Sequence, residues 1–150
     1  MEFWQEISHR AYEILKPLGM KKVQVASVPD GDGLNLSRSR KVRYLGIDAP
    51  EMRAKQYANQ PFSRQARDFN ALLVLRRQVV LLSDGISDRD EHGRLLRHVF
   101  VDGRWVNAAM LLTGLAKPSH LNQQEKRIAV MLRNCGQQAK AHYLGLWQHP

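Results

Sequence analysis

The stretch VRYLGIDAPE, residues 42–51, contains an alternating apolar strand that runs directly into a turn. The turn carries two carboxylates, Asp48 and Glu51, and Arg43 lies five residues before the first of them. Loops at strand ends are where rigid scaffolds commonly hold catalytic and binding groups. We therefore expect the chemistry of this chain at the end of this strand.

Two further turns carry charged side chains of the same kinds. Asp30-Gly31-Asp32 lies upstream of the strand, and Asp90-Glu91-His92-Gly93-Arg94 lies downstream of it. Carboxylate oxygens are ligands for hard metal cations, and guanidinium groups match the geometry of phosphate oxygens. Together the three turns indicate a cation-assisted attack on a phosphodiester.

Composition places the chain among ordinary globular domains. Its 150 residues suit a single domain with a real core, and 43% hydrophobic and 25% charged residues are typical values. No apolar run reaches the length needed to cross a bilayer, so we expect no membrane segment. The single cysteine, Cys135, excludes an intrachain disulfide framework.

The net charge of +9 favours a polyanionic partner, and nucleic acid is the commonest one. A lysine-rich surface without such a partner would give the same charge. The basic residues Arg38, Arg40, Lys41 and Arg43 cluster just before the carboxylate turn. An acidic pocket within a positive field suits a metal site that serves an anionic substrate.

Periodicity predicts a mixed α+β chain. We expect strands over residues 21–28, 34–36, 42–47, 79–82 and 95–101, and helices over 61–75, 107–112 and 123–143. The apolar stripe of the 61–75 helix is expected to include Phe62, Ala66, Phe69, Leu72 and Leu73.

The N-terminal residues do not resemble a secretory signal, because acidic residues interrupt them and no continuous apolar stretch is present. Without such a signal the default expectation is a cytoplasmic protein. Phe3, Ile7, Tyr12 and Leu15 can share one face of a helix that ends near Pro17. We expect residues 1–20 to form a helical extension outside a domain at 21–150.

The three turns, in this order, resemble the staphylococcal-nuclease-like family of calcium-dependent nucleases. The family pattern has an Asp-Gly-Asp turn, an Arg-x-x-x-x-Asp-x-Pro-Glu strand end and an Asp-x-x-Gly-Arg turn. The resemblance continues through residues 101–110, 114–117 and 145–147, so it covers roughly residues 21–148. It implies an OB-fold, a five-stranded β-barrel with about three flanking helices.

The resemblance also implies roles for individual residues. Asp32 and Asp48 would bind calcium, together with the backbone carbonyl of Ala49. Glu51 would act as general base, or at least orient the attacking water. Each residue alone has a simpler interpretation, because Asp-Gly and Asp-Ala-Pro are common turn formers and a glutamate after a turn is usually a surface residue.

Arg43 and Arg94 are the predicted phosphate-binding residues, since a guanidinium offers parallel donors and keeps its charge. A simple salt bridge between Arg94 and Asp90 is the alternative. His92 and His120 stand where the family often has tyrosines that contact the nucleotide, and Lys117 could also face the nucleic acid. A solvated surface position is the simpler interpretation for all three.

Two positions qualify the resemblance. Gly33 replaces a threonine that braces the Asp-Gly-Asp turn in the family, so we expect weaker metal binding. Asn107 is expected to anchor the start of the 107–112 helix and not to bind a ligand.

The sequence thus predicts a monomeric, calcium-dependent nuclease that cleaves DNA and RNA with little sequence preference. By resemblance, it would cut the 5′ P–O bond and leave 3′-phosphate ends. A catalytically inactive nucleic-acid-binding module on the same fold is the main alternative. A basic ribosome-associated protein would explain the charge but not the ordered acidic turns.

Overall fold

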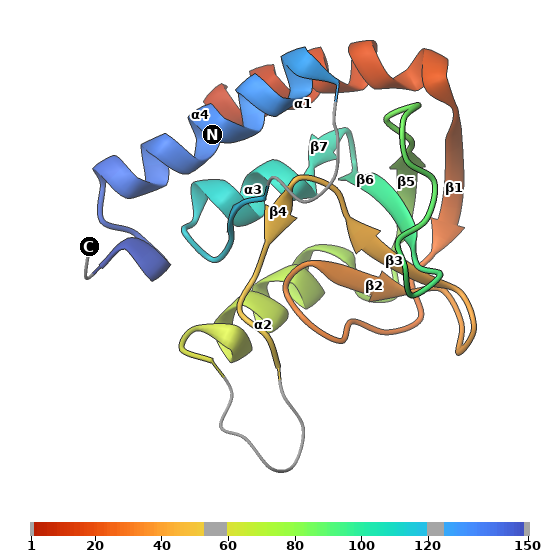
Figure 1. The fold of residues 1–150 in the computed structure, drawn as a ribbon, viewed down its shortest axis with the longest axis horizontal. Coiled ribbons are helices and arrows are strands. Elements are labelled where there is room, and N and C mark those ends of the chain that lie inside the picture. Colours follow the sequence, from red (N-terminus) through yellow and green to blue (C-terminus); the bar gives the residue numbers. More distant parts are fainter. Residues whose placement is uncertain (1, 53–59, 120–124, 149–150) are drawn as a thin grey trace.

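The protein has a mixed α+β fold in a computed structural model that describes residues 2–52, 60–119 and 125–148. Four α-helices surround a curved sheet (Figure 1). The helices are α1 Glu2–Leu15, α2 Ser63–Val74, α3 Val106–Leu112 and α4 Lys126–Ala141, with 3-10 turns η1 Lys16–Leu18 and η2 Gly145–Trp147. The predicted α+β class is therefore confirmed.

The main sheet has the strand order β1-β5-β6-β3-β2, and β7 pairs with β6. Its strands are β1 Met20–Gln24, β2 Gly33–Asn35, β3 Lys41–Tyr44, β5 Gln78–Leu82, β6 Leu95–Val101 and β7 Arg104–Trp105. All pairs are antiparallel except β3 with β6, which is parallel. A separate antiparallel pair joins β4 Ile47–Asp48 to β8 Lys117–Pro118.

The sheet is mostly open in the described residues, and the closed five-stranded barrel predicted above is not seen. After Gln24, where the pairing of β1 with β5 ends, the chain continues toward β2. In the described residues it contacts β2 through an isolated bridge between Ser27 and Asn35, not through a continuous strand pair. The predicted strand 42–47 is also wrong as a single strand. It is divided at Gly46, whose φ of 77° bends the chain between β3 and β4.

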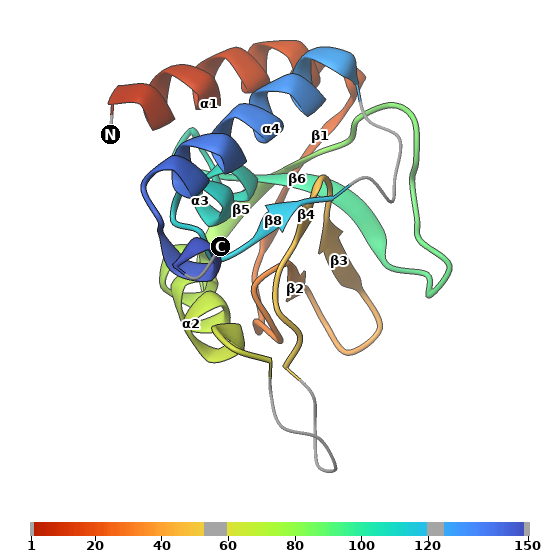
Figure 2. The same cartoon turned by 60° about the vertical axis from the view of Figure 1, so that its left-hand side comes forward.

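Helix α1 packs on the same hydrophobic core as the sheet. Trp4, Ile7, Ala11 and Leu15 are buried in it, whereas Phe3, which the sequence placed on the buried face, is 37% exposed. The Trp4 indole donates a hydrogen bond to the Trp105 carbonyl at 2.9 Å. Figure 2 shows α1 and α4 along one side of the molecule, next to α3.

Helix α2 covers another side of the sheet (Figure 1). Its buried face contains Ala66, Asn70 and Val74. Leu72 is 76% exposed, so its predicted place in the apolar stripe is wrong. A polar residue, Asn70, fills the middle of this face instead.

None of the helices in the described ranges combines the length and apolar character needed to cross a membrane.

Candidate active site

The predicted site residues from all three turns line one cavity of about 450 Å³. Its walls contain two arginines and several carboxylates: Asp30, Asp32, Arg43, Asp48, Glu51, Glu91 and Arg94, together with Met52. The segments that carry them are separated in sequence by β2, α2 and β5. Folding therefore brings these charged groups together, as the sequence predicted.

Sheet pairing explains why the arginines converge. Strands β3 and β6 run parallel with Val42 opposite Leu95 and Arg43 opposite Leu96. Arg94 comes directly before β6, so it emerges at the same edge of the sheet as Arg43. On the other side of β3, the Tyr44 amide donates to the Asp32 carbonyl at 2.8 Å, which places the Asp-Gly-Asp turn beside Arg43.

Asn70 of α2 holds the Asp-Gly-Asp turn in place through hydrogen bonds to its backbone. The Asn70 amide group donates to the carbonyl oxygens of Asp30 and Gly33 at 2.9 and 3.0 Å, and its Oδ1 accepts from the Tyr44 hydroxyl at 2.7 Å. Asn70 is fully buried. A buried amide with its hydrogen bonds satisfied fixes the turn relative to α2 and β3.

The Asp32 carboxylate lies at the base of the cavity and is only 7% exposed. Its Oδ2 accepts a hydrogen bond from the Ala49 amide at 2.8 Å. Burial raises the pKa of Asp32 to about 7, although Arg43 opposes this shift and Asp30 adds to it. A buried carboxylate with so little compensation is a group that a nearby cation would stabilise.

Arg43 connects the strand end to both aspartates. Its Nη1 donates to the carbonyl oxygens of Tyr44 and Ile47, both at 2.9 Å. Its Nη2 lies 3.4 Å from Asp32 Oδ2 and 3.5 Å from Asp48 Oδ1. These two distances exceed those of a tight charge-assisted hydrogen bond, so Nη2 is held near the acids without being bound closely by either.

Arg94 is positioned by Asp90 within its own turn. The Arg94 Nε donates to Asp90 Oδ2 at 2.7 Å, and its backbone amide donates to Asp90 Oδ1 at 2.9 Å. Partial burial alone would raise the pKa of Asp90, but the hydrogen bonds from Arg94 lower it on balance. The salt bridge considered above is therefore present; it engages Nε of Arg94, which also lines the cavity.

Glu51 and Asp48 lie at the more open part of the site. The Asp48 side chain is 63% exposed. The backbone amide of Glu51 donates to Gln60 Oε1 at 2.9 Å, which connects the carboxylate turn to the segment before α2. Glu51 is exposed, so its carboxylate can be reached from solvent.

Two of the other predicted nucleic-acid contacts, His92 and Lys117, do not line this cavity. The His92 ring lies outside it, 3.6 Å from Glu91 and largely exposed. Lys117 of β8 lies opposite Asp48 of β4 in the strand register. The Lys117 ammonium lies 4.6 Å from the centre of the Trp147 ring. His120 lies outside the described residues.

Several residues with a clear structural role were not assigned one from sequence. Asp30 and Glu91 line the cavity. The only signal for Asn70 was a polar residue within the apolar stripe of a predicted helix. Asn107, by contrast, is confirmed as an anchor, because it accepts from the Val99 amide and donates to the Leu45 carbonyl.

The cavity offers oxygen ligands, the kind that hard cations such as calcium prefer. Asp32 and Asp48 offer carboxylate oxygen atoms of this kind, whereas Ala49 does not line this cavity. Within the described ranges, however, no group of three or more Asp, Glu, His or Cys side chains converges closely enough to hold an ion. These residues could therefore supply only part of a coordination shell, and water would complete it.

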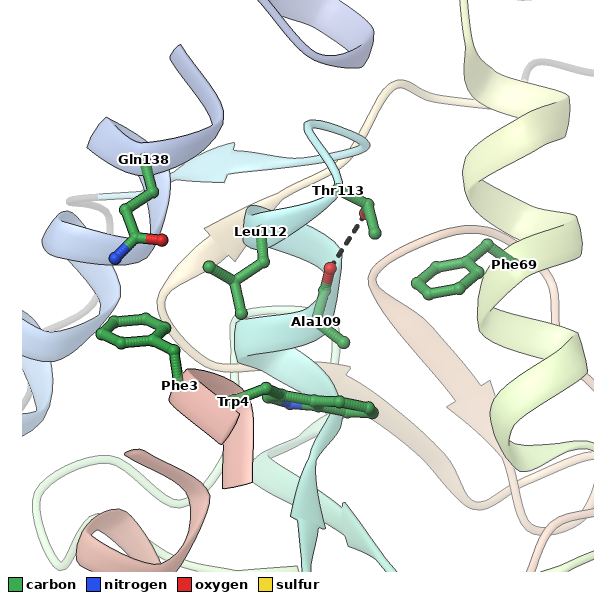
Figure 3. A pocket seen from close by; sticks show the side chains of 7 residues that line it. All are labelled: Phe3, Trp4, Phe69, Ala109, Leu112, Thr113 and Gln138. Atoms are coloured by element: carbon green, nitrogen blue, oxygen red, sulfur yellow. Dashed lines mark hydrogen bonds between the residues drawn. The ribbon is translucent and has the colours of Figure 1, made fainter. Parts of the chain in front are cut away.

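A second, more apolar cavity of about 260 Å³ is not a comparable site. It lies where α1, α2, α3 and α4 meet, and Figure 3 shows Phe3, Trp4, Phe69 and Leu112 around it. The Thr113 hydroxyl on its wall is already bonded to the Ala109 carbonyl at 2.9 Å. Among the residues that the structure describes, no ionisable side chain lines this cavity, so they offer no acid, base or charged phosphate-binding group there.

Comparison with known proteins identifies relatives of this chain. Residues 41–149 match the family described as staphylococcal nuclease homologue. Over 121 residues, the chain is 33% identical to endonuclease YncB of Bacillus subtilis (strain 168), with 79% of this chain and 57% of that protein covered. SPbeta prophage-derived endonuclease YokF of the same strain is 32% identical over 121 residues, with 79% and 41% covered.

A third relative, thermonuclease of Staphylococcus intermedius, is 24% identical over 127 residues, which cover 83% of this chain and 74% of that protein. The chain spans about half the length of the two Bacillus subtilis relatives. The family model covers well over half of the present chain. The chain therefore belongs to the staphylococcal nuclease family.

Proposed function

We propose that the chain is a calcium-dependent nuclease that hydrolyses the phosphodiester backbone of DNA and RNA with little sequence preference. The observation that carries this proposal is the convergence of Asp32, Arg43, Asp48, Glu51 and Arg94 in one cavity. A purely structural role does not explain why three separate turns place their charged groups around one space. Backbone phosphates carry no sequence information, so recognition through them is unspecific.

The arginines would bind the scissile phosphate. Arg43 is fixed by two carbonyl groups and Arg94 by Asp90, so both guanidinium groups are oriented before substrate arrives. Charge on the phosphoryl oxygens increases as a fifth ligand approaches phosphorus. Oriented cationic donors therefore favour the transition state over the ground state.

Glu51 would serve as general base. It would take a proton from water as the water oxygen forms a bond to phosphorus. The P–O5′ bond then breaks, which leaves a 3′-phosphate on one product and a 5′ oxygen that takes a proton from solvent on the other. The exposure of Glu51 at the cavity rim is compatible with contact to both water and substrate.

Asp32, Asp48 and the Ala49 carbonyl would hold the calcium ion. When bound, the ion would polarise a phosphate oxygen and orient water. Asp32 is held by the Ala49 amide, so its position is fixed independently of the metal. The buried, poorly compensated charge of Asp32 is the feature of this structure that supports a cation here.

A direct test is digestion of plasmid DNA and of RNA with calcium, with magnesium and with chelator. We expect cleavage of both substrates with calcium and none with chelator. Equal cleavage with and without chelator would overturn the metal-dependent mechanism. Binding of both nucleic acids without cleavage under any condition would instead identify an inactive binding module.

A further inference from the structure

A second polar cavity, of about 480 Å³, is lined in part by the 88–95 segment, which also contributes to the site described above. We call it the basic cavity, and it is defined by the side chains Lys21, Arg40, Arg89 and Arg97 with Asp88. Four cationic residues face one carboxylate. None of these residues lines the candidate active site.

The single acid of the basic cavity is already paired. Arg97 Nη2 lies 2.6 Å from Asp88 Oδ1, and Arg89 Nε lies 3.9 Å from Asp88 Oδ2. Within the described part of the chain, the side chains of Lys21 and Arg40 form no ion pair. Both residues are exposed. The cavity therefore keeps a surplus of positive charge that faces solvent.

Two segments of the chain, the one around β3 and the 88–95 segment, contribute residues to both cavities. Arg40 directly precedes β3 and Arg43 lies within it, three residues further on, so at about 3.3 Å per residue of extended chain their Cα atoms are about 10 Å apart. Arg89 faces the basic cavity, while Glu91 and Arg94 of the same turn face the active site. A bridge between Arg89 and Leu95 closes this turn.

We propose that the basic cavity binds the sugar–phosphate backbone of a single nucleic-acid strand, next to the nucleotide that is cleaved. A strand that leaves the active site would cross the 88–94 turn and meet Arg89 and Arg40. Figures 1 and 2 both show the loop between β5 and β6 on the same side of the molecule as the turn between β2 and β3. The proposal rests on the proposed nuclease function.

The chemistry of the cavity suits a flexible single strand. Positively charged grooves follow the phosphates of such strands. Leu18 and Met20 on the cavity wall are 45% and 46% exposed, which provides apolar surface beside the cations. The concave cavity and the short path across the turn favour one bendable strand over a stiff duplex.

The test compares a long single-stranded DNA with a dinucleotide as substrates of the variant Arg40→Gln/Arg89→Gln. For the long strand we expect KM to rise about threefold to tenfold, and the slope of log Kd against log salt to fall by about 0.7 per lost phosphate contact. For the dinucleotide, kcat and KM should remain those of the wild type. A strand that is too short to reach the basic cavity cannot report its loss.

The control is Arg10→Gln/Arg133→Gln, which removes the same charge from the exposed surfaces of α1 and α4. If this control raises KM for the long strand equally, the effect is one of net charge and the proposal is wrong. The proposal is also wrong if the test variant slows dinucleotide cleavage, because the cavity would then act through the active site.

The experiment also distinguishes failure of this proposal from failure of the proposed nuclease function. If the wild type cleaves neither substrate, binding of the long strand, measured by fluorescence anisotropy, decides the role of the basic cavity. Weaker binding by the Arg40→Gln/Arg89→Gln variant than by the control supports it. Equal binding by both variants overturns it.

Discussion

At the scale of single residues, the two arginines of the site differ in how they are held. Arg43 uses one terminal nitrogen on the carbonyl groups of Tyr44 and Ile47, so it also stabilises the strand end. Arg94 uses Nε on Asp90 within its own turn, and it lines the cavity. Substitution of Arg94 therefore separates catalysis from folding more cleanly than substitution of Arg43.

Replacement of Arg94 by lysine should lower turnover of single-stranded DNA by roughly 10²- to 10³-fold, as expected for loss of one oriented donor in a transition state. Lysine keeps the charge but lacks the planar pair of donors. The salt dependence of DNA binding should stay the same. Steady-state kinetics on single-stranded DNA measures the turnover, and DNA binding at several salt concentrations measures the salt dependence, with Arg133→Lys on α4 as control. Normal turnover by Arg94→Lys would contradict the assignment of this residue.

At the scale of elements, the Asp-Gly-Asp turn depends on close packing against α2. A Cβ atom on Gly31 would lie 2.7 Å from the Cβ of Ala66 and 2.9 Å from the Cβ of Ala49. Neither neighbour is the end of a flexible side chain. The turn can therefore approach the helix this closely only because residue 31 is glycine.

We expect Gly31→Ala to reduce the free energy of unfolding by about 1–3 kcal/mol, the usual cost of overpacking. Its effect should be smaller when Ala66 is replaced by glycine, because this removes the closer of the two clashing atoms. Urea unfolding of the two single variants and the double variant measures the coupling. Equal losses from Gly31→Ala in both backgrounds would show that packing against Ala66 is not the cause.

Local motifs of the site could be predicted from the sequence, but contacts between distant elements could not. The turns with Asp32, Asp48 and Arg94 could be recognised because each is a short, local motif, and local motifs retain their spacing in any fold. The role of Asn70 could not be recognised, because its hydrogen bonds reach Asp30 and Gly33 from a different element.

The surface against which α1 packs could not be predicted from the sequence for the same reason. Trp4 donates to Trp105, which lies 101 residues further along the chain. Periodicity indicates that a helix has an apolar face but not which surface covers it. The two-residue strands β7 and β8 were also missed, because strands this short exist only through their pairing partners.

At the scale of the whole molecule, His98 makes stability depend on pH. It is fully buried in β6, and its Nδ1 accepts a hydrogen bond from the Trp105 indole at 3.2 Å. Burial lowers its pKa from 6.5 to about 3. Below pH 6.5 the unfolded chain therefore binds a proton that the folded chain does not, and stability falls as pH decreases toward 3.

Comparison with His98→Asn isolates this effect, since asparagine can still accept from Trp105 but does not titrate. The advantage in unfolding free energy of the wild type over the variant should shrink by about 1.4 kcal/mol per pH unit below 6.5. Asp32 contributes with the opposite sign, because its raised pKa adds stability as pH falls from 7, but it is common to both proteins. Parallel stability curves between pH 7 and 4 would contradict a neutral, buried His98.

The proposed mechanism depends on one cavity in which Glu51 acts as the general base. Glu91 lines the same cavity but has no catalytic role here, so Glu91→Gln is a matched control for Glu51→Gln. The most direct measurement is turnover of single-stranded DNA in calcium by the wild type and these two variants, with DNA binding measured in parallel. We predict that Glu51→Gln loses about 10²- to 10⁴-fold in turnover, as is typical for removal of one acid–base group. DNA binding by Glu51→Gln and turnover by Glu91→Gln should stay close to wild type. If Glu51→Gln cleaves at the wild-type rate, Glu51 is not the base and the proposed mechanism is wrong.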